Sequence, residues 1–288
     1  MNLHPTFDDI LEAQEYELRR LIHESPPKET LKLLKRAESE LDRRLKSIPS
    51  GTFDYIRLSM VMVQVRAVML SVDAAIQKKN IQWNSAVKKA ASKHMMQMLK
   101  AGEAQFPQAA PTSFAEIREA TLFTGRAGAG DSLVRRFNTY ANRYTQSVIQ
   151  RIEQELSVGI ATNKSTDEIV GSLSDKKKGI RADEWKIERI VRTELSHAYS
   201  TFYLEDAKAI HSKDSTLRVR WTELVDDATG RPMDKRVGED SIQLHGQVRV
   251  PGERFKDYVL GGEPMMPPNR PHDRGRLVIV RGAWKKSA

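Results

Sequence analysis

The sequence predicts a mainly α fold of long amphipathic helices, followed by a small α+β module at the C-terminus. The charged fraction of 30% and the mean hydropathy of −0.54 suit long helices with solvated faces. Apolar side chains recur at helical spacing until Ser212, after which short β-rich runs alternate with turn-forming residues. We therefore expect a helical body at residues 1–179 and an α+β module at residues 180–288.

The first two helices are predicted from a cap and two proline-containing breaks. A helix is expected from Thr6 or Asp8, either of which can serve as its N-cap, to about His23. Ser25-Pro26-Pro27 is expected to end it. The same prolines suit the first turn of a second helix, because a missing N–H costs nothing there. That helix is predicted to run to about Ile48, before the break at Pro49-Ser50-Gly51.

The third predicted helix is unusually long. From Thr52 to about Gln105 there is no proline and one glycine, which predicts one helix of residues 52–105 or two joined end to end. Its first half is rich in Val, Met and Leu, whereas residues 76–102 carry six lysines and no acid. This asymmetry favours one buried half and one half facing a polyanion. The alternative is that the lysines only keep an exposed helix soluble.

The remaining elements follow from turn and capping signals. The predicted order is a turn at 106–112, a glycine-rich flexible loop at 125–130, helices at 131–159 and 165–171, an exposed linker at 175–179, a helix at 181–211, and strands at 217–224, 243–250 and 275–282. The strands are short and separated by turn compositions, which is typical of a small module.

Charge and composition narrow the classes of function. The formal net charge is +9 and the isoelectric point is near 9.6, which indicates attraction to polyanions such as DNA or acidic protein surfaces. The absence of cysteine excludes disulfides and thiolate metal sites. No signal peptide is recognisable, and the apolar stretch Met60–Ala75 is interrupted by Gln64, Arg66 and Asp73. We therefore expect a soluble protein with no membrane partner.

Candidate catalytic side chains lie in the loops of the C-terminal module. Asp226, Asp227, His245, His272 and Asp273 are the residue types of a hydrolytic metal site. No HExxH or HxH motif and no Gly-x-Ser-x-Gly elbow accompanies them, and aspartates commonly fix turns. We expect no metal, no cofactor and no catalytic residue. A metal-dependent nuclease or hydrolase of this module is the alternative function.

A second candidate pair lies on the predicted helix 181–211. Arg192 and Glu194 are two residues apart, so on a helix they face different directions and are poorly placed to act on one substrate atom. A structural role is favoured, in which one of them anchors the C-terminal module through hydrogen bonds. A third class of function, a sequence-specific DNA-binding regulator, would need a compact helix-turn-helix, and no such short turn between helices is found.

An ordered set of residues covers roughly 189–280. Its elements are Arg192-Thr193-Glu194 with Tyr199, then Trp221, Asp226-Asp227, Arg231, His245-Gly246, Phe255, Pro267-Pro268 and the basic run Arg270–Arg276. In this order the chain resembles the Mu F-like minor head (head morphogenesis) proteins of phages. Many of those proteins end the segment with a Cys-Arg-Cys group, whereas this chain has no cysteine. Any metal-binding role of that group therefore does not transfer.

The resemblance implies a virion structural protein and not an enzyme. It implies a minor capsid protein of the capsid interior or portal vertex, present in the host cytoplasm during assembly and oligomeric or multi-copy in the virion. The implied partners are the portal protein, the major capsid protein, or both, and packaged double-stranded DNA, contacted without sequence preference. The candidate DNA-binding residues are Lys78, Lys79, Lys88, Lys89, Lys93, Lys100, Arg270, Arg274 and Arg276. The structural signature residues are Arg192, Thr193, Glu194, Trp221, Asp226, His245 and His272.

Overall fold

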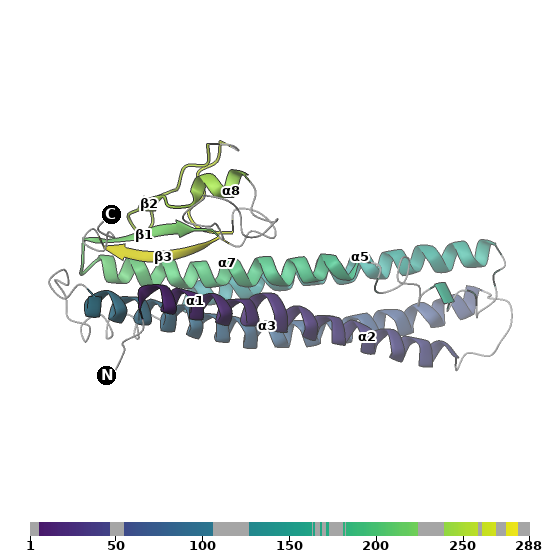
Figure 1. Ribbon diagram of the computed structural model, residues 1–288. Helices are drawn as coiled ribbons and strands as arrows, with labels where there is room; N and C mark the ends of the chain where they lie inside the picture. The colour runs from purple at the N-terminus through teal and green to yellow at the C-terminus, as the bar shows by residue number, and fades with distance from the viewer. Residues whose placement is uncertain are drawn as a thin grey trace. The chain divides into compact units, whose positions relative to one another are not determined.

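A computed structural model describes most of the chain, and it is mainly α with a small antiparallel sheet near the C-terminus, as predicted (Figure 1). The described residues are 6–46, 55–105, 127–162, 164, 168, 171–172, 181, 183–223, 239–258, 261–268 and 275–281. They divide into two compact units. Unit 1 comprises Met1–His23, Trp83–Leu133 and Arg192–Ala288, and unit 2 comprises Glu24–Gln82 and Val134–Val191. The predicted boundary at 179/180 lies outside the described residues and stays a prediction.

The N-terminal helices begin as predicted but are not separated. Helix α1 (Phe7–Leu18) starts with a capping box, in which Thr6 and Asp9 satisfy each other's backbone N–H groups. A π-helical turn (Arg19–Glu24) leads directly into α2 (Ser25–Lys46). The predicted break at Ser25-Pro26-Pro27 is therefore wrong, because the prolines occupy the first turn of α2, where their missing N–H groups are tolerated.

Helix α3 (Tyr55–Gln105) is one continuous helix, which confirms the first of the two predicted forms. In unit 2 one face of α3 is buried, and Val61, Val65 and Val68 are at most 4% exposed. Met60 and Val63, on another face, are each 63% exposed. The expectation that the apolar half of this helix is buried therefore holds for one face only.

Part of α3 meets a simple criterion for a membrane span. Within Met60–Ala104 an 18-residue window has a mean hydropathy of 1.4, and 39% of that window is buried. Core helices of soluble proteins meet the same criterion. In unit 2 this helix also carries buried Asp73 and Asn80, which make polar contacts with neighbouring helical side chains, as core helices of bundles do.

Helices α5 (Ala127–Ala161) and α7 (Glu184–His211) complete the helical part. The predicted flexible loop at 125–130 is wrong for residues 127–130, which form the first turn of α5. A side chain added at Gly130 would reach the ring of Phe202, so this turn packs against α7 in unit 1. The predicted turn at 106–112, the linker at 175–179 and most of the helix at 165–171 lie outside the described residues.

Unit 2 is held together by contacts among α2, α3 and α5. On α3, Arg66 pairs with Glu153 of α5 (Nη2–Oε1 2.5 Å), and Asn80 donates to Asn138 of α5 (3.0 Å). The later residue of α3, Asn80, contacts the earlier residue of α5, Asn138, so the two helices are antiparallel. Leu34 and Leu41 of α2 are buried in the same core.

In unit 1 the sheet lies against α7 (Figure 1). Its strands are β1 (Leu217–Thr222), β2 (Val248–Arg249) and β3 (Arg276–Arg281), in the antiparallel order β2-β1-β3. Val219 of β1 stands opposite Arg249 and Ile279. The backbone N–H of Ile279 donates to the Tyr203 hydroxyl (3.2 Å), which joins the sheet to α7.

The strand predicted at 243–250 is wrong in its first half. Gln243 and Leu244 end a short helix, α8 (Glu239–Leu244), and strand pairing begins at Val248. Between them Gly246 has a φ of 79° and donates its N–H to the carbonyl of Trp221 (2.8 Å). This tight turn, which alternating hydrophobicity does not reveal, brings β2 alongside β1.

Candidate functional site

Trp221, one of the signature residues predicted from the sequence, lies in a buried cluster of the C-terminal module. Its indole is fully buried, and its Nε1–H donates to the carboxylate of Glu223 at 2.6 Å. The ring of Phe255, also fully buried, meets the indole edge to face, with centroids 5.2 Å apart. Alternation along β1 puts Trp221 on the buried face of the sheet. These two aromatic rings therefore form the interior of the C-terminal module.

His245 is attached to the same cluster through the backbone. The N–H of Glu223 donates to Nδ1 of His245 at 3.1 Å, so in the neutral ring the proton lies on Nε2. The Glu223 side chain is 4% exposed. Glu223 was missed by the sequence analysis, because its partner His245 is 22 residues away and no motif links them.

Gly275 closes the cluster from the start of β3. A Cβ added there would lie 2.8 Å from Nε1 of Trp221 and closer still to the carboxylate of Glu223. Only glycine therefore fits without displacing that hydrogen-bonded pair. The sequence marked this glycine only as part of a basic run, and its packing role comes from the structure.

Most of the residues in the metal-site hypothesis lie outside the part of the chain that the structure describes. Among all the described residues, no group of three or more His, Asp or Glu side chains could hold a metal ion. Asp226, Asp227, His272 and Asp273 lie outside the described part of the chain, as do Arg231, Arg270 and Arg274. Of the predicted ligand types, the structure therefore places only His245, beside the newly found Glu223.

The Arg-Thr-Glu segment lies on α7. Glu194 is buried at 7% exposure, while Arg192 and Thr193 are half-buried. Neighbouring Val191 and Leu195 are fully buried in the helical core. Burial of Glu194 suits the structural role expected for it, and its anchoring of the module stays a prediction.

Unit 1 also contains a buried polar chain that the sequence did not indicate. His94 of α3 is fully buried, with Nε2 3.0 Å from the Glu17 carboxylate of α1 and Nδ1 3.1 Å from the Tyr199 hydroxyl of α7. Lys93 reaches the same Glu17 oxygen at 2.8 Å. Burial lowers the pKa of His94 despite the carboxylate beside it. A neutral His94 that donates from Nε2 and accepts at Nδ1 satisfies both neighbours.

Glu17 responds to the same burial in the opposite sense. Burial by itself would raise the pKa of Glu17, but hydrogen bonds from Lys93 and His94 outweigh it, so the pKa of this carboxyl is lowered. Glu17 is therefore ionised at neutral pH, and the contact with His94 is a hydrogen bond to a carboxylate and not an ion pair.

Two ion pairs tie β3 to the rest of unit 1. Arg276, a candidate DNA-binding residue, has 15% of its side chain exposed and contacts Glu15 of α1. Arg281 and Asp214 form a pair at 2.7 Å, with 1% and 0% of their side chains exposed. Arg276 is thus used inside the unit, which makes it a weaker phosphate ligand than an exposed arginine.

The six candidate lysines of α3 fall into two groups. Three have partners inside the protein: Lys79 pairs with Glu29 (3.1 Å), Lys93 with Glu17 (2.8 Å), and Lys88 lies 5.8 Å from the ring centre of Phe202. The other three are exposed and make no ion pair within the described ranges: Lys78, Lys89 and Lys100. Lys89 and Lys100, both in unit 1, are 11 residues or ~16.5 Å apart on one helix face.

No protein-family model, curated protein or solved structure matches this chain.

Proposed function

We propose that the chain is a virion structural protein, a minor head protein of the Mu F-like kind. In this proposal it lies at the capsid interior or portal vertex and contacts the portal or major capsid protein during head assembly. The observation that carries it is the burial of two aromatic residues on which the resemblance depends. Trp221 and Phe255 are fully buried, Trp221 donates to the carboxylate of Glu223, and the backbone N–H of Glu223 donates to His245. Such residues maintain a scaffold for docking.

Contact with packaged DNA is the second part of the proposal. Lys78, Lys89 and Lys100 are exposed on a long helix and make no ion pair with the described side chains. Lysines of this kind neutralise phosphates without reading the base sequence. That property suits a protein that must accept any packaged sequence.

The location is tested on purified virions of the phage that encodes the chain. After nuclease treatment and gradient purification, we expect the polypeptide to sediment with DNA-filled heads and to co-purify with the portal protein from assembling heads. Its absence from both fractions would overturn the proposal.

The DNA contact is tested with two matched triple variants. Replacing Lys78, Lys89 and Lys100 with Gln should reduce the salt dependence of binding to duplex DNA, by about 0.9 in the log–log slope for each phosphate that is no longer neutralised. The control replaces the internally partnered lysines, Lys79, Lys88 and Lys93, and should change the slope little. Equal slopes for the two variants would contradict direct contact through the exposed group.

The alternative function, a metal-dependent nuclease or hydrolase, is tested with the purified parent protein. Incubation with supercoiled plasmid and Mg²⁺ or Mn²⁺ should leave the plasmid intact. Metal-dependent cleavage that is abolished in His245→Ala would favour a nuclease of the C-terminal module and overturn the non-catalytic assignment. Cleavage that persists in that variant would point to a contaminating nuclease.

A further inference from the structure

Helices α2 and α3 of unit 2 enclose an apolar groove. A cavity of about 240 Å³ opens between them. Its floor is formed by Leu33 and Ala37 of α2 and by Val68 and Val72 of α3. The α3 wall is low, because Ala67, Ser71 and Ala75 recur every four residues along it. Small side chains at this spacing let another helix approach closely.

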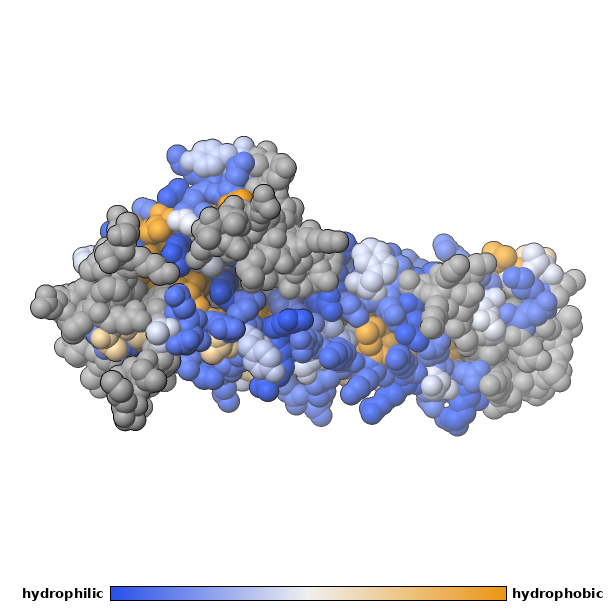
Figure 2. All heavy atoms as spheres, in the orientation of Figure 1, coloured by the Kyte–Doolittle hydropathy of each residue, from blue (hydrophilic) through white to orange (hydrophobic). Residues whose placement is uncertain are grey.

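The groove continues onto an exposed apolar stripe of α3. Met60, Val63 and Leu70 are 63%, 63% and 52% exposed, and Ala67 and Ala74 are exposed between and beyond them. The spacing is three, four, three and four residues, which is the seam of a coiled coil, and it extends over ~21 Å. Ala67 belongs to both the stripe and the groove wall, so the two surfaces are continuous. Figure 2 shows that the visible surface is mostly hydrophilic, with small hydrophobic patches between the hydrophilic side chains.

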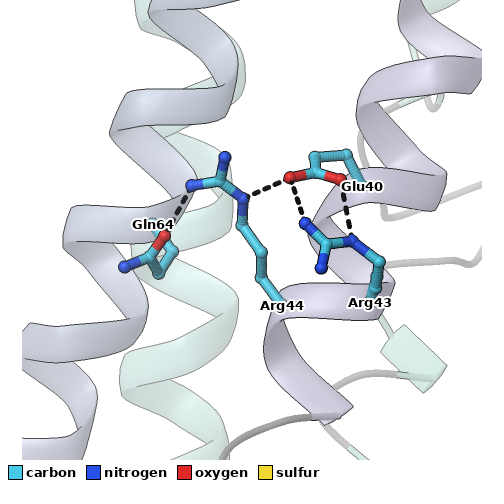
Figure 3. Close-up of polar contacts among 4 residues, drawn as sticks. All are labelled: Glu40, Arg43, Arg44 and Gln64. Carbon is cyan, nitrogen blue, oxygen red and sulfur yellow. Dashed lines mark hydrogen bonds and ion pairs between the residues drawn. The ribbon is translucent and has the colours of Figure 1, made fainter.

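The rim of the groove is positively charged. Along α2, Arg36, Glu40 and Arg44 line it at intervals of four residues. Figure 3 shows that the single carboxylate is shared: Glu40 accepts from Arg43 (2.8 and 3.0 Å) and from Nε of Arg44 (2.6 Å). These contacts lower the pKa of Glu40 to about 2, so it stays ionised and remains occupied by its two arginines.

The arginines that line the groove outnumber its one carboxylate, Glu40. Arg44 reaches across to Gln64 of α3 (2.6 Å), which holds its guanidinium at the mouth of the groove. Arg36 is exposed and makes no ion pair within the part of the chain that the structure describes. Two arginines therefore share Glu40, and Arg36 makes no ion pair with any side chain that the structure describes.

This charge identifies the kind of partner that fits. A second copy of the chain would bring the same arginines to the seam, and like charges across an interface are unfavourable. An acidic helix would pair with Arg36 and with the shared arginines while its apolar side chains cover Met60, Val63 and Leu70. We infer that the α2–α3 groove of unit 2 binds an amphipathic helix with acidic flanks, contributed by another protein. This inference does not depend on the proposed role in the virion.

The test uses synthetic three-heptad peptides and the full-length protein. One peptide has Leu at the core positions and Glu at the flanking positions, and the matched peptide has Lys in place of Glu. In fluorescence anisotropy at low salt, we expect the Glu peptide to bind roughly tenfold or more tightly than the Lys peptide. Failure of both peptides to bind, or equal affinity for the two, would overturn the inference.

Two substitutions locate the binding on the protein. Leu70→Glu should weaken the Glu peptide roughly tenfold or more, since it places an acid in the seam. Tyr16→Glu, on α1 of unit 1 and 73% exposed, is the matched control and should leave the affinity unchanged. Both side chains are exposed, so both variants should keep the helical circular dichroism of the parent. An unchanged affinity in Leu70→Glu would contradict this location.

The charge assignment and the rival occupant are tested separately. Arg36→Glu should weaken the Glu peptide and strengthen the Lys peptide, because it reverses the charge of the rim. If Arg36→Glu prefers the Glu peptide over the Lys peptide as strongly as the parent does, the inference of an acidic partner is overturned. Sedimentation equilibrium addresses self-association: a dimer of the parent that Leu70→Glu abolishes would mean that a second copy covers the stripe, against our inference.

Discussion

Unit 1 contains an ion pair that is almost fully buried, whereas an ion pair that joins two helices of unit 2 is largely exposed. In unit 1 the pair Arg281–Asp214 has 1% and 0% of its side chains exposed, and His94 is buried between α1 and α7. In unit 2 the pair Arg66–Glu153 has 61% and 33% of its side chains exposed. Buried polar groups are costly unless paired, so they determine which segments meet, whereas exposed pairs contribute little to stability. The Arg281–Asp214 pair of unit 1 should therefore matter much more for stability than the exposed Arg66–Glu153 pair of unit 2.

The largest effect is expected at the buried pair. Arg281→Met should lower the free energy of unfolding by about 3–5 kcal/mol, because Asp214 is left as an uncompensated buried charge. Urea denaturation followed by circular dichroism measures the decrease. The double variant Arg281→Met/Asp214→Asn should recover much of it. If Arg281→Met lowers the free energy of unfolding by no more than the loss of an exposed pair does, burial does not make the Arg281–Asp214 pair more important than the Arg66–Glu153 pair.

Close packing in the C-terminal module should produce the next largest effect. Gly275→Ala should cost about 1–3 kcal/mol, since its methyl group would collide with Trp221 and Glu223. Gly262→Ala is the control, because nothing lies within 4 Å of a Cβ added there. Thermal unfolding of the two variants side by side tests this. Equal melting temperatures would show that the Trp221–Glu223 pair can move without cost.

A buried acid in unit 1 should be destabilising at neutral pH. Burial raises the pKa of Asp206 to about 6, although Ser92 donates to its carboxylate at 2.7 Å. The folded-state pKa then exceeds the unfolded value of 3.8, so the folded state binds the proton more tightly. The tighter proton binding stabilises the folded state; this contribution is complete below about pH 4 and is lost as the pH rises to about 6.

Asp206→Asn removes that penalty. It should raise the free energy of unfolding by about 1–2 kcal/mol at pH 7 and by less at pH 4, since a shift of one pKa unit is worth about 1.4 kcal/mol and Asp206 keeps some solvent contact. Urea titrations at the two pH values measure the difference. The lowered pKa of His94 acts in the opposite direction, with stability lost below about pH 6.5, but it is common to both proteins and cancels. An equal increase in the free energy of unfolding at pH 4 and at pH 7 would contradict the raised pKa of Asp206.

The smallest effect is expected in unit 2. Arg66→Gln breaks the exposed pair with Glu153 and should change the free energy of unfolding by less than about 1 kcal/mol. The same urea assay at low and high salt checks this, with little difference between the two conditions. A decrease comparable to that of Arg281→Met would mean that exposed pairs stabilise unit 2 as strongly as buried pairs stabilise unit 1.

Much of the fold could be predicted because its signals are local. The absence of proline predicted either one long helix or two joined end to end at α3, and alternation of apolar residues predicted β1 and β3. The errors have tertiary causes. Gly130 enters α5 where that helix packs near Phe202, and His245-Gly246 forms a turn that positions β2 beside β1.

The candidate site was predictable only in part, for a related reason. Trp221, His245 and Glu194 were singled out by their residue types and order along the chain. Glu223 and Asp214 were not, because their partners His245 and Arg281 are distant in sequence and no short motif relates them. A buried carboxylate gives no sign of its burial in the sequence when its partner comes from another element.

By itself the sequence determined the helical class, the long helix, two of the three strands and the positive charge, because periodicity, proline and composition act over a few residues. The tertiary structure decided which of the six lysines of α3 are used internally and which side of that helix stays apolar and exposed. Helical periodicity tells which residues share a face. What the face meets depends on segments many turns away, such as Glu29 for Lys79 and Glu17 for Lys93.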